Sequence, residues 1–586
     1  MNDNSWYSPD PAAREQTQTP SAPQQPGDPR CAYAPLPVPG APPYGAAACA
    51  RPSPEERQQP VPPPERPTVS VRDKVFAWLT AIAGYVFFCA FPMSQKPLGA
   101  ILFWIALYAF TFLIQLRGRE RFRPVQTAVL VCAVLAAAAA FVWKNGFIAF
   151  FCFSYIFVAY IYLVYAATGN TLEEGLSRLI GADIIRAAFV FPFRSFVRIW
   201  TAMFSRSGKS GLGRTLLKLG LGLLLAVIPT ALVLALLSFD KGFTSLLEDI
   251  FRFESFDPSK TMLRLIFGVP LAMYLFGLYV SSVSGRCRHI MSAESCRAHA
   301  ERRRVLPLVT AIAALTPLLM VYIIFFISQW GYYTSAFTGV LPRGLNYADY
   351  ARGGFFELCA VSGINFVVIV CVGVFLKRGH KGIGIALSVV FALVTLILIA
   401  TAMSKLMLYI SEYGLSSDRV YAVWFMLLLT LLFIAVIIGQ FSTRFKTLPV
   451  CIAVTVFMFL LIALSGPNRW IAKYNVDLYL SGRSESIDLD YLYDLGTDAV
   501  PELLRLENEI AERNGFSRPH SDHKLDGLQE SYRGDLGVYL RVTFQLQLMA
   551  YENHYTLKDG VQSYTLSAFR AEKLLAEAGY ELERSH

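Results

Sequence analysis

The chain has 586 residues, of which 54% are hydrophobic and only 16% are charged. Because a soluble domain carries about 25% charged residues, this composition excludes an ordinary water-soluble fold. The formal net charge is +10, but residues 467–586 hold about 20 acidic and about 13 basic side chains, which leaves about +17 on the rest. Basic residues between apolar runs are typical of membrane topology, so we expect no nucleic-acid partner.

Residues 1–70 form a proline-rich tail that contains about 18 of the 32 prolines. Such a segment buries too little apolar surface to offset the entropy of ordering, so we expect a disordered tail with polyproline-II character. Residues 39–42 fit a PxxP pattern, which is either a ligand for a polyproline-binding partner or part of a plain linker. The polar start of the chain predicts no cleaved signal peptide.

Eleven apolar runs follow the tail, and a helix of about 20 apolar residues crosses a bilayer. They predict an all-α integral membrane protein with about eleven transmembrane helices in residues 71–466. The predicted spans are 75–92, 98–116, 125–143, 147–167, 215–238, 262–283, 305–328, 355–376, 382–403, 419–440 and 447–465.

Lysine and arginine are concentrated in alternate gaps between these runs. The clusters precede the first span and follow the second, fourth, sixth, eighth and tenth. The positive-inside rule therefore predicts that the N-terminus is cytoplasmic. Since the number of spans is odd, the C-terminal region is then expected on the extracytoplasmic side.

The gap near residues 180–205 is too basic to cross the membrane and too aromatic to be fully solvated. It predicts an amphipathic helix, broken near Pro192, that lies in the inner membrane interface. The alternative is a segment buried against the bundle. We expect four of its side chains to lie at the interface, with the arginines near anionic headgroups: Arg186, Arg194, Arg198 and Trp200.

The region 467–586 predicts a small, mostly α extracytoplasmic domain. Residues 487–506 read as two short helices, and Thr497 or Asp498 is expected to cap the second. Residues 538–549 alternate enough to be either a strand or a buried helix. Two early aromatic residues suit the outer membrane interface: Trp470 and Tyr474.

Three stretches of the chain carry a family resemblance. They are LPRGLNYADYARGGFFEL at 341–358, the segment 403–419 with its YISEYGL sequence, and 475–501, with a weaker similarity at 564–571. These stretches resemble bacterial membrane proteins described as domain of unknown function 4173, and its relative 4153. The resemblance covers the chain from about the fifth apolar run onward, without the tail. It implies a multi-pass protein of the bacterial inner membrane and assigns no catalytic residue.

Glu357 lies about a turn inside the eighth predicted span, and Lys405 lies at the outer end of the ninth. Charged groups at membrane depth are costly and usually face the bundle interior or a cavity. We therefore expect a polar cluster beneath the outer surface. It is either a binding pocket for a lipid headgroup, an envelope precursor or an ion, or a structural network that pins loops to the bundle. Its other expected members are Tyr347, Asp349, Arg352, Tyr409, Glu412 and Arg419.

The sequence gives little support to a metal site or a common hydrolase. One candidate pattern, Cys-x-His-x₆-Cys-x₂-His, departs from the usual spacing of zinc ligands and lies among arginines that disfavour a cation. No Walker-type loop, GxSxG or HExxH motif is present. We expect neither metal nor cofactor. The residues of the candidate pattern are Cys287, His289, Cys296 and His299.

These observations favour a non-enzymatic membrane protein, an envelope or signalling-associated component whose outer α domain binds a protein partner. A second hypothesis is a transporter or lipid-handling protein that uses the cluster around Glu357 and Lys405. A third is a membrane-embedded transferase acting on a lipid-linked substrate. The bilayer itself is an expected partner in each case, with anionic lipid at the inner face.

Overall fold

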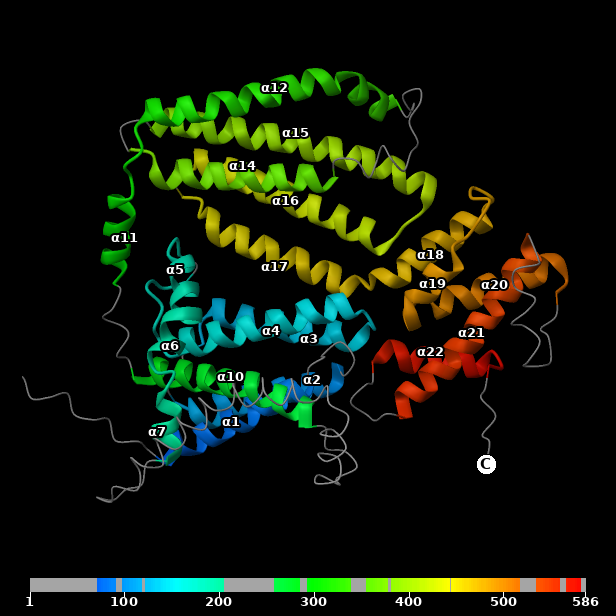
Figure 1. The fold of residues 1–586 in the computed structure, drawn as a ribbon, viewed down its shortest axis with the longest axis horizontal. Helices are drawn as coiled ribbons and strands as arrows, with labels where there is room; N and C mark the ends of the chain where they lie inside the picture. Colours follow the sequence, from blue (N-terminus) through cyan, green and yellow to red (C-terminus); the bar gives the residue numbers. More distant parts are fainter. Residues whose placement is uncertain are drawn as a thin grey trace, which may run out of the picture. The chain divides into compact units, whose positions relative to one another are not determined.

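The structure is a computed structural model that describes most of the chain after the tail. All of its regular structure is helical (Figure 1), apart from one isolated β-bridge between Leu306 and Leu376. The predicted tail at 1–70 and the fifth predicted span at 215–238 lie outside the described residues. The described ranges are 71–90, 97–118, 122–175, 177–204, 258–284, 292–338, 355–377, 381–442, 444–516, 534–558 and 565–580.

Eight helical segments within these ranges are long and apolar enough to cross a membrane, so the chain is a multi-pass integral membrane protein. Their outer faces expose large apolar side chains to the bilayer, among them Ile324 at 66% and Phe457 at 63% exposure. Each coincides with one of the predicted spans. The segments are Pro97–Gln115, Pro124–Val142, Gly146–Ala167, Met262–Ser284, Leu308–Ser328, Gly382–Ser411, Ser417–Phe441 and Thr447–Ser465.

The first group of helices surrounds an aromatic core that includes Trp104, Phe153 and Tyr160. Helix α1 packs along α10, and α3 packs along α4 (Figure 1). Gly84 of α1 and Gly268 of α10 allow this approach, because a Cβ on either would collide with the other's backbone. The helices are α1 (Val71–Ala90), α2 (Pro97–Ala109), its π-helical continuation η3 (Phe110–Gln115), α3 (Pro124–Val142), α4 (Gly146–Ala167) and α10 (Pro258–Ser284).

The second group is joined inside the membrane by polar side chains. Tyr322 donates to Asn365 Oδ1 at 2.5 Å, and Asn365 Nδ2 donates to the Thr395 hydroxyl at 2.8 Å, which links three helices. Helix α17 packs on both α16 and α3 and so connects the two groups. The helices are α12 (Leu308–Thr338), α14 (Phe355–Phe375), α15 (Lys381–Tyr413), α16 (Ser417–Phe441) and α17 (Thr447–Ser465), with the short α11 (Ala293–Arg302) before them.

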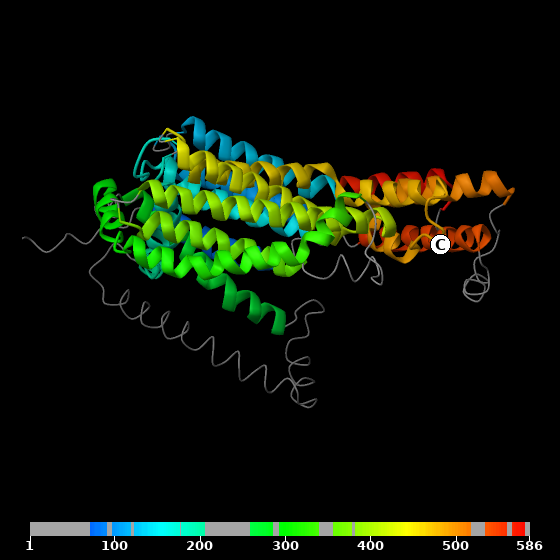
Figure 2. The ribbon, with the colours of Figure 1, turned by 90° about the horizontal axis from the view of Figure 1, so that it is seen from above.

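The last helices share a separate core, in which Leu492, Leu503 and Leu546 are fully buried. Figure 2 shows these orange and red helices grouped beyond the end of α17, and α18 contacts α16. Residues 538–549, for which a strand and a helix were both considered, are helical. The helices are α18 (Pro467–Leu480), α19 (Leu489–Asp494), the 3₁₀ turn η6 (Gly496–Asp498), α20 (Val500–Asn514), α21 (Asp535–Lys558) and α22 (Leu566–Glu577). We call them the C-terminal domain.

The basic aromatic segment forms four short helical pieces, of which the last three contact α10 and the first contacts α17. Pro192 lies in the first turn of a piece, and the chain breaks three residues later, at Ser195. Tyr274 of α10 donates to the carbonyl of Ala188 at 2.8 Å, which satisfies a group that the π-turn leaves free. The pieces are α5 (Ile180–Ile185), the π-helical η4 (Arg186–Val190), α6 (Phe191–Arg194) and α7 (Arg198–Phe204).

Candidate functional site

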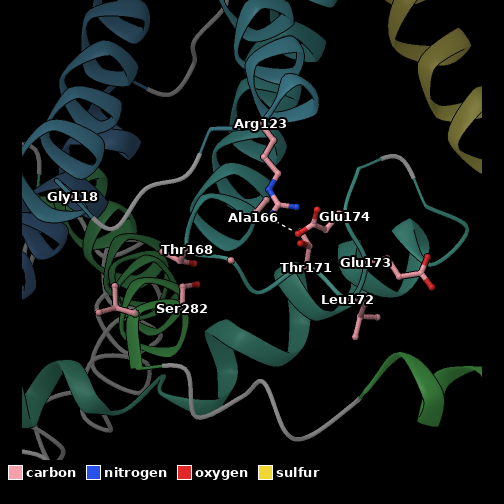
Figure 3. A pocket seen from close by; sticks show the side chains of 11 residues that line it. Gly118, Arg123, Ala166, Thr168, Thr171, Leu172, Glu173, Glu174 and Ser282 are labelled. Carbon is pink, nitrogen blue, oxygen red and sulfur yellow. Dashed lines mark hydrogen bonds and ion pairs between the residues drawn. The ribbon is translucent and has the colours of Figure 1, made fainter.

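A polar cavity of about 680 Å³ opens where α3 begins, beside the C-terminal ends of α4 and α10 (Figure 3). Sites for small molecules usually have volumes of about 300–1,000 Å³. This one differs from most in the polarity of its wall. The lining residues are Gly118, Arg123, Ala166, Thr168, Gly169, Thr171, Leu172, Glu173, Glu174, Ser282 and Val283.

The charged groups of the wall are neutralised in pairs. Arg123 Nη2 lies 2.8 Å from Glu174 Oε1 (Figure 3), and Glu173 pairs with Arg297 of α11. The Glu174 side chain is 84% exposed, and such pairs contribute only about 0–1 kcal/mol. The cavity wall is therefore close to neutral, and the Arg123–Glu174 pair can open at little cost.

Beneath the cavity lies a buried carboxylate, Asp183, which is 3% exposed. Its Oδ1 accepts hydrogen bonds from Tyr165 Oη at 2.6 Å and from the Leu172 N–H at 3.0 Å. Arg186 Nη1 lies 3.8 Å from the same oxygen. Desolvation raises the pKa of Asp183, and these partners act in the opposite direction. A buried ion pair of this kind is costly to break from either side.

Arg186 is buried inside the protein, whereas the sequence predicted that it would face lipid headgroups at the membrane interface. It is 2% exposed, and its guanidinium lies 5.7 Å from the ring centroid of Tyr165 and 5.5 Å from that of Phe191. The reason is Asp183, which lies one helical turn earlier on the same face and turns the arginine inward. Asn170 joins this network, since its carbonyl accepts from Arg186 at 3.4 Å.

The outer face of the same segment is apolar. Ile185, Phe189, Phe193 and Val197 recur every four residues and are each more than half exposed. The segment thus has Asp183 and Arg186 inside and large apolar side chains outside, as expected for contact with lipid. Of the other predicted interfacial residues, Arg194 is exposed, while Arg198 and Trp200 are half-buried.

Ser282 of α10 lines the cavity, but its side chain takes no part in this hydrogen-bond network. It is 1% exposed, and its Oγ forms no hydrogen bond with any described residue. Its carbonyl, in contrast, accepts from Asn170 Nδ2 at 3.0 Å. A buried hydroxyl without a partner is costly, and this one belongs to a residue that lines the cavity.

The predicted outer cluster is described only in part. Arg419 donates to the carbonyl of Tyr413 at 2.9 Å and to that of Gly414, and it stacks 4.1 Å above the Tyr409 ring. These contacts fasten the turn between α15 and α16, and Lys405 lies half-buried earlier in α15. Glu357 and Glu412 lie in helices, but their side chains are outside the described part of the structure. The other three members lie wholly outside it: Tyr347, Asp349 and Arg352.

The candidate metal pattern is also split by the limits of the described residues. Cys296 and His299 lie on α11, and the ring of His299 bonds the carbonyl of Ser295 at 2.9 Å. Cys287 and His289 lie outside the described ranges. Among the described residues, no group of three potential ligands lies close enough to hold a metal ion.

The end of α3 and the start of α4, opposite the cavity, contact the C-terminal domain and the helices that lead to it. Asn145 caps α4 and also donates to Asn468 Oδ1 at 2.9 Å and to Tyr421 Oη at 3.0 Å. Trp143 donates to the carbonyl of Leu464 at 3.2 Å. Gly466, which has a φ of +64°, lies against the Trp143 ring and joins α17 to α18.

On the side of the C-terminal domain, Asp498 lies beside this junction, near Val142 and Trp143. It was expected to cap the next helix, but α20 has no side-chain cap, and Asp498 accepts instead from Ser567. It is 3% exposed, its Oδ2 has no described hydrogen-bond partner, and desolvation raises its pKa. A cavity of about 40 Å³ lies beside it, between Arg469 and Arg570. That volume suits about one water molecule.

The comparisons with known proteins agree with part of the resemblance seen in the sequence. A family described as domain of unknown function (DUF4153) matches residues 130–506. The matched region runs from within α3 to within α20, so it includes the floor of the cavity and the junction at Asn145. No curated protein and no solved structure matches the chain.

Proposed function

The chain belongs to the DUF4153 family, and we propose that it is a non-enzymatic transmembrane coupling component. In this proposal the C-terminal domain binds a protein partner on one side of the membrane. The polar cavity binds a small polar ligand on the other side. One observation carries the proposal: the hairpin of α3 and α4 reaches the cavity at Arg123 and Thr168, and it reaches the C-terminal domain at Trp143 and Asn145.

The packing of the hairpin supports coupling between its ends. Helices α3 and α4 contact each other along their length, and α3 contributes Ala133, Ala136 and Ala140 to the buried core. Small residues let two membrane helices approach closely, so that a shift at one end is carried to the other. Helix α17 packs on α3 and continues through Gly466 into α18, which gives the same movement a second connection.

The topology follows as part of the proposal. Eight candidate spans, α1, α14 and the apolar run at 215–238 together make eleven crossings, and residues 360–375 of α14 form a shorter apolar helix without a charged side chain. With the basic gaps in the cytoplasm of a bacterium, the cavity opens to the cytoplasm and the C-terminal domain lies outside. The protein would then report an intracellular ligand to a partner in the cell envelope.

Hydrogen–deuterium exchange of the full chain in nanodiscs tests the coupling. Ser282→Phe fills the cavity, and Thr171→Trp fills it from the opposite wall. Both variants should alter exchange at 143–147 and in α18, although neither residue lies near them. Ser284→Phe, on the exposed face two residues away, is the matched control and should leave exchange there unchanged. Equal effects of Ser284→Phe, or no effect of either filling variant, would contradict the proposal.

Photocrosslinking in cells tests the partner. A photoreactive residue replaces Tyr551, which is 47% exposed on α21, or Leu431, which is 40% exposed in the lipid-facing part of α16. The first position should give one crosslinked protein of constant mass, and the second should not. The yield should change with Ser282→Phe and not with Ser284→Phe. An equal crosslinking yield in the wild type and in Ser282→Phe would contradict the coupling. It would indicate a complex that forms whether or not the cavity is filled.

A further inference from the structure

The C-terminal domain carries a basic and aromatic face beside the membrane. Its residues come from the first two turns of α18 and α22, and we call them the proximal face. The apolar members are strongly exposed, with Trp470 at 37%, Leu566 at 48% and Phe569 at 54%. The basic members are also exposed: Arg469, Lys473 and Arg570.

The two helices bring three of these residues to one place. Arg469, Leu566 and Arg570 line the small cavity together with Val142 and Trp143, at the end of α3. The face is therefore next to the end of a membrane-spanning helix. Only one carboxylate lines the same cavity, that of Asp498, and it is buried and bonded by Ser567.

Where α18 continues along the bilayer normal from the end of α17, Trp470 falls within the headgroup layer and Lys473 at its outer edge. Helix α18 starts two residues after the last residue of α17, Ser465. With a rise of 1.5 Å per residue, Trp470 lies about 5 Å and Lys473 about 9 Å beyond the start of α18. The headgroup region of one leaflet is about 5–8 Å thick. Aromatic rings and basic side chains are both typical of this layer.

The cations of the face form no salt bridge with a described residue. Arg469 is attracted to the buried Asp498 carboxylate across the small cavity, whereas Arg570 and Lys473 have no carboxylate partner among the described residues. Elsewhere in the domain, arginines are engaged, as Arg505 is by Asp477 and Glu502. An unpaired basic group above apolar side chains complements a phosphodiester above acyl chains.

We propose that the proximal face binds the headgroup of an anionic phospholipid. Arg469 and Arg570 would hold the phosphodiester from two sides of the small cavity, and Lys473 would add positive charge above it. Phe569 and Leu566 would enter the acyl boundary. This binding would fix the C-terminal domain against the membrane surface, and it does not depend on the coupling proposed above.

Quenching by brominated lipids tests the proposal on the full chain in nanodiscs. The signal of Trp470 is the difference between the wild type and Trp470→Phe. At equal mole fraction, brominated phosphatidylglycerol should quench this signal more than brominated phosphatidylcholine. Equal quenching by the two lipids in the wild type would overturn the proposal without any variant.

Charge variants test which residues give the preference. Each basic residue near a membrane surface contributes about a five-fold change in anionic-lipid binding. Arg570→Gln should weaken the apparent affinity for phosphatidylglycerol by about that factor, and Arg469→Gln with Arg570→Gln should remove the preference. Arg483→Gln, an exposed arginine of the same domain, should not. An unchanged preference in the double variant, with helix content intact, would contradict the assignment.

Soluble anions distinguish a lipid from a free phosphate. Millimolar inorganic phosphate or glycerol phosphate should not displace the brominated lipid, because neither supplies acyl chains for Phe569 and Leu566. Displacement by either would show that the site takes a free phosphate group, and would overturn the lipid assignment.

Discussion

Tyr165 and Asp183 are joined by a 2.6 Å hydrogen bond between the phenol and Oδ1. The tyrosine belongs to the last turns of α4, and the aspartate belongs to the short helix that follows. The bond therefore folds the chain back beneath the polar cavity. Because Arg186 and the Leu172 N–H bond the same carboxylate, the shape of the cavity depends on this one group.

We expect Tyr165→Phe to destabilise the protein by about 1.5–3 kcal/mol, the usual contribution of a hydrogen bond to a charged group. Tyr162→Phe is the control on the same helix, because Tyr162 is electrostatically near Asp183 but forms no hydrogen bond with it, so it isolates the contribution of the bond. The measurement is thermal unfolding of the purified protein in detergent. Equal losses in both variants would show that the phenol–carboxylate bond contributes nothing specific.

Gly466→Ala should destabilise the junction between α17 and α18 in two ways. An alanine is strained at a φ of +64°, at a cost of about 1–2 kcal/mol, and its Cβ would also collide with the Trp143 ring. Gly482→Ala separates the two effects, since Gly482 has a φ of +71° and no atom near its Cβ position. The unfolding midpoint should fall clearly further for Gly466→Ala. Similar shifts would mean that the ring moves aside freely.

The raised pKa of Asp498 gives a prediction for the dependence of stability on pH. Burial raises this pKa above 3.8 in the folded protein, so the folded state binds a proton more readily than the unfolded state. The contribution of the group to stability is therefore greatest below pH 3.8 and is lost as pH rises through the folded pKa. Asp498→Asn should remove this part of the slope. The difference between the two stability curves is the measurement.

A control for general effects of charge is available on the same domain. Asp494 is exposed on α19, and Asp494→Asn should leave the curve close to that of the wild type. Identical curves for Asp498→Asn and the wild type between pH 4 and pH 8 would contradict the role assigned to burial.

The spans could be predicted because apolar length alone determines them. Ten of the eleven predicted runs coincide with described helices, and the remaining one, at 215–238, lies outside the described residues. The end of α15 was predicted at residue 403, but the helix continues to Tyr413. The polar Ser404 and Lys405 ended the predicted span, and the apolar Leu406 and Ile410 restore a buried face in the next turns.

The polar sites could not be predicted because their partners are distant in sequence. Ser567 lies 69 residues from Asp498, and Asn468 lies 323 residues from Asn145. From the sequence, Arg186 was expected to contact lipid headgroups. Its position inside the protein depends on Asp183 and on the packing of Tyr165, which the sequence pattern does not show. The sequence did not indicate Ser282 as a cavity residue, because a serine in an apolar run is typical of close helix packing.

Reporter fusions test the proposed topology. A fusion after Ser205 should behave as cytoplasmic, and a fusion after Arg483 should behave as extracytoplasmic, because an odd number of predicted spans separates them. A phosphatase that is active only outside the cytoplasm and a fluorescent protein that folds only inside it give opposite readouts at each site. Matching behaviour at the two positions would disprove the orientation.

A double-mutant cycle tests the pairing expected between Glu357 and Lys405. If they pair at membrane depth, Glu357→Ala and Lys405→Ala should each cost about 3–5 kcal/mol, because each leaves the other charge uncompensated. The double variant should then cost clearly less than the sum. Ser404→Ala, beside Lys405 on α15, controls for the helix itself. Additive losses in unfolding experiments would show that the two residues do not interact.

A second measurement separates a structural pair from a binding site. Glu357→Gln removes the charge and keeps the shape of the side chain. If the pair only holds helices together, a stabilised background should restore crosslinking of the partner together with thermal stability. If the pair binds a ligand, stability should return without crosslinking, because the carboxylate that contacts the ligand is still missing.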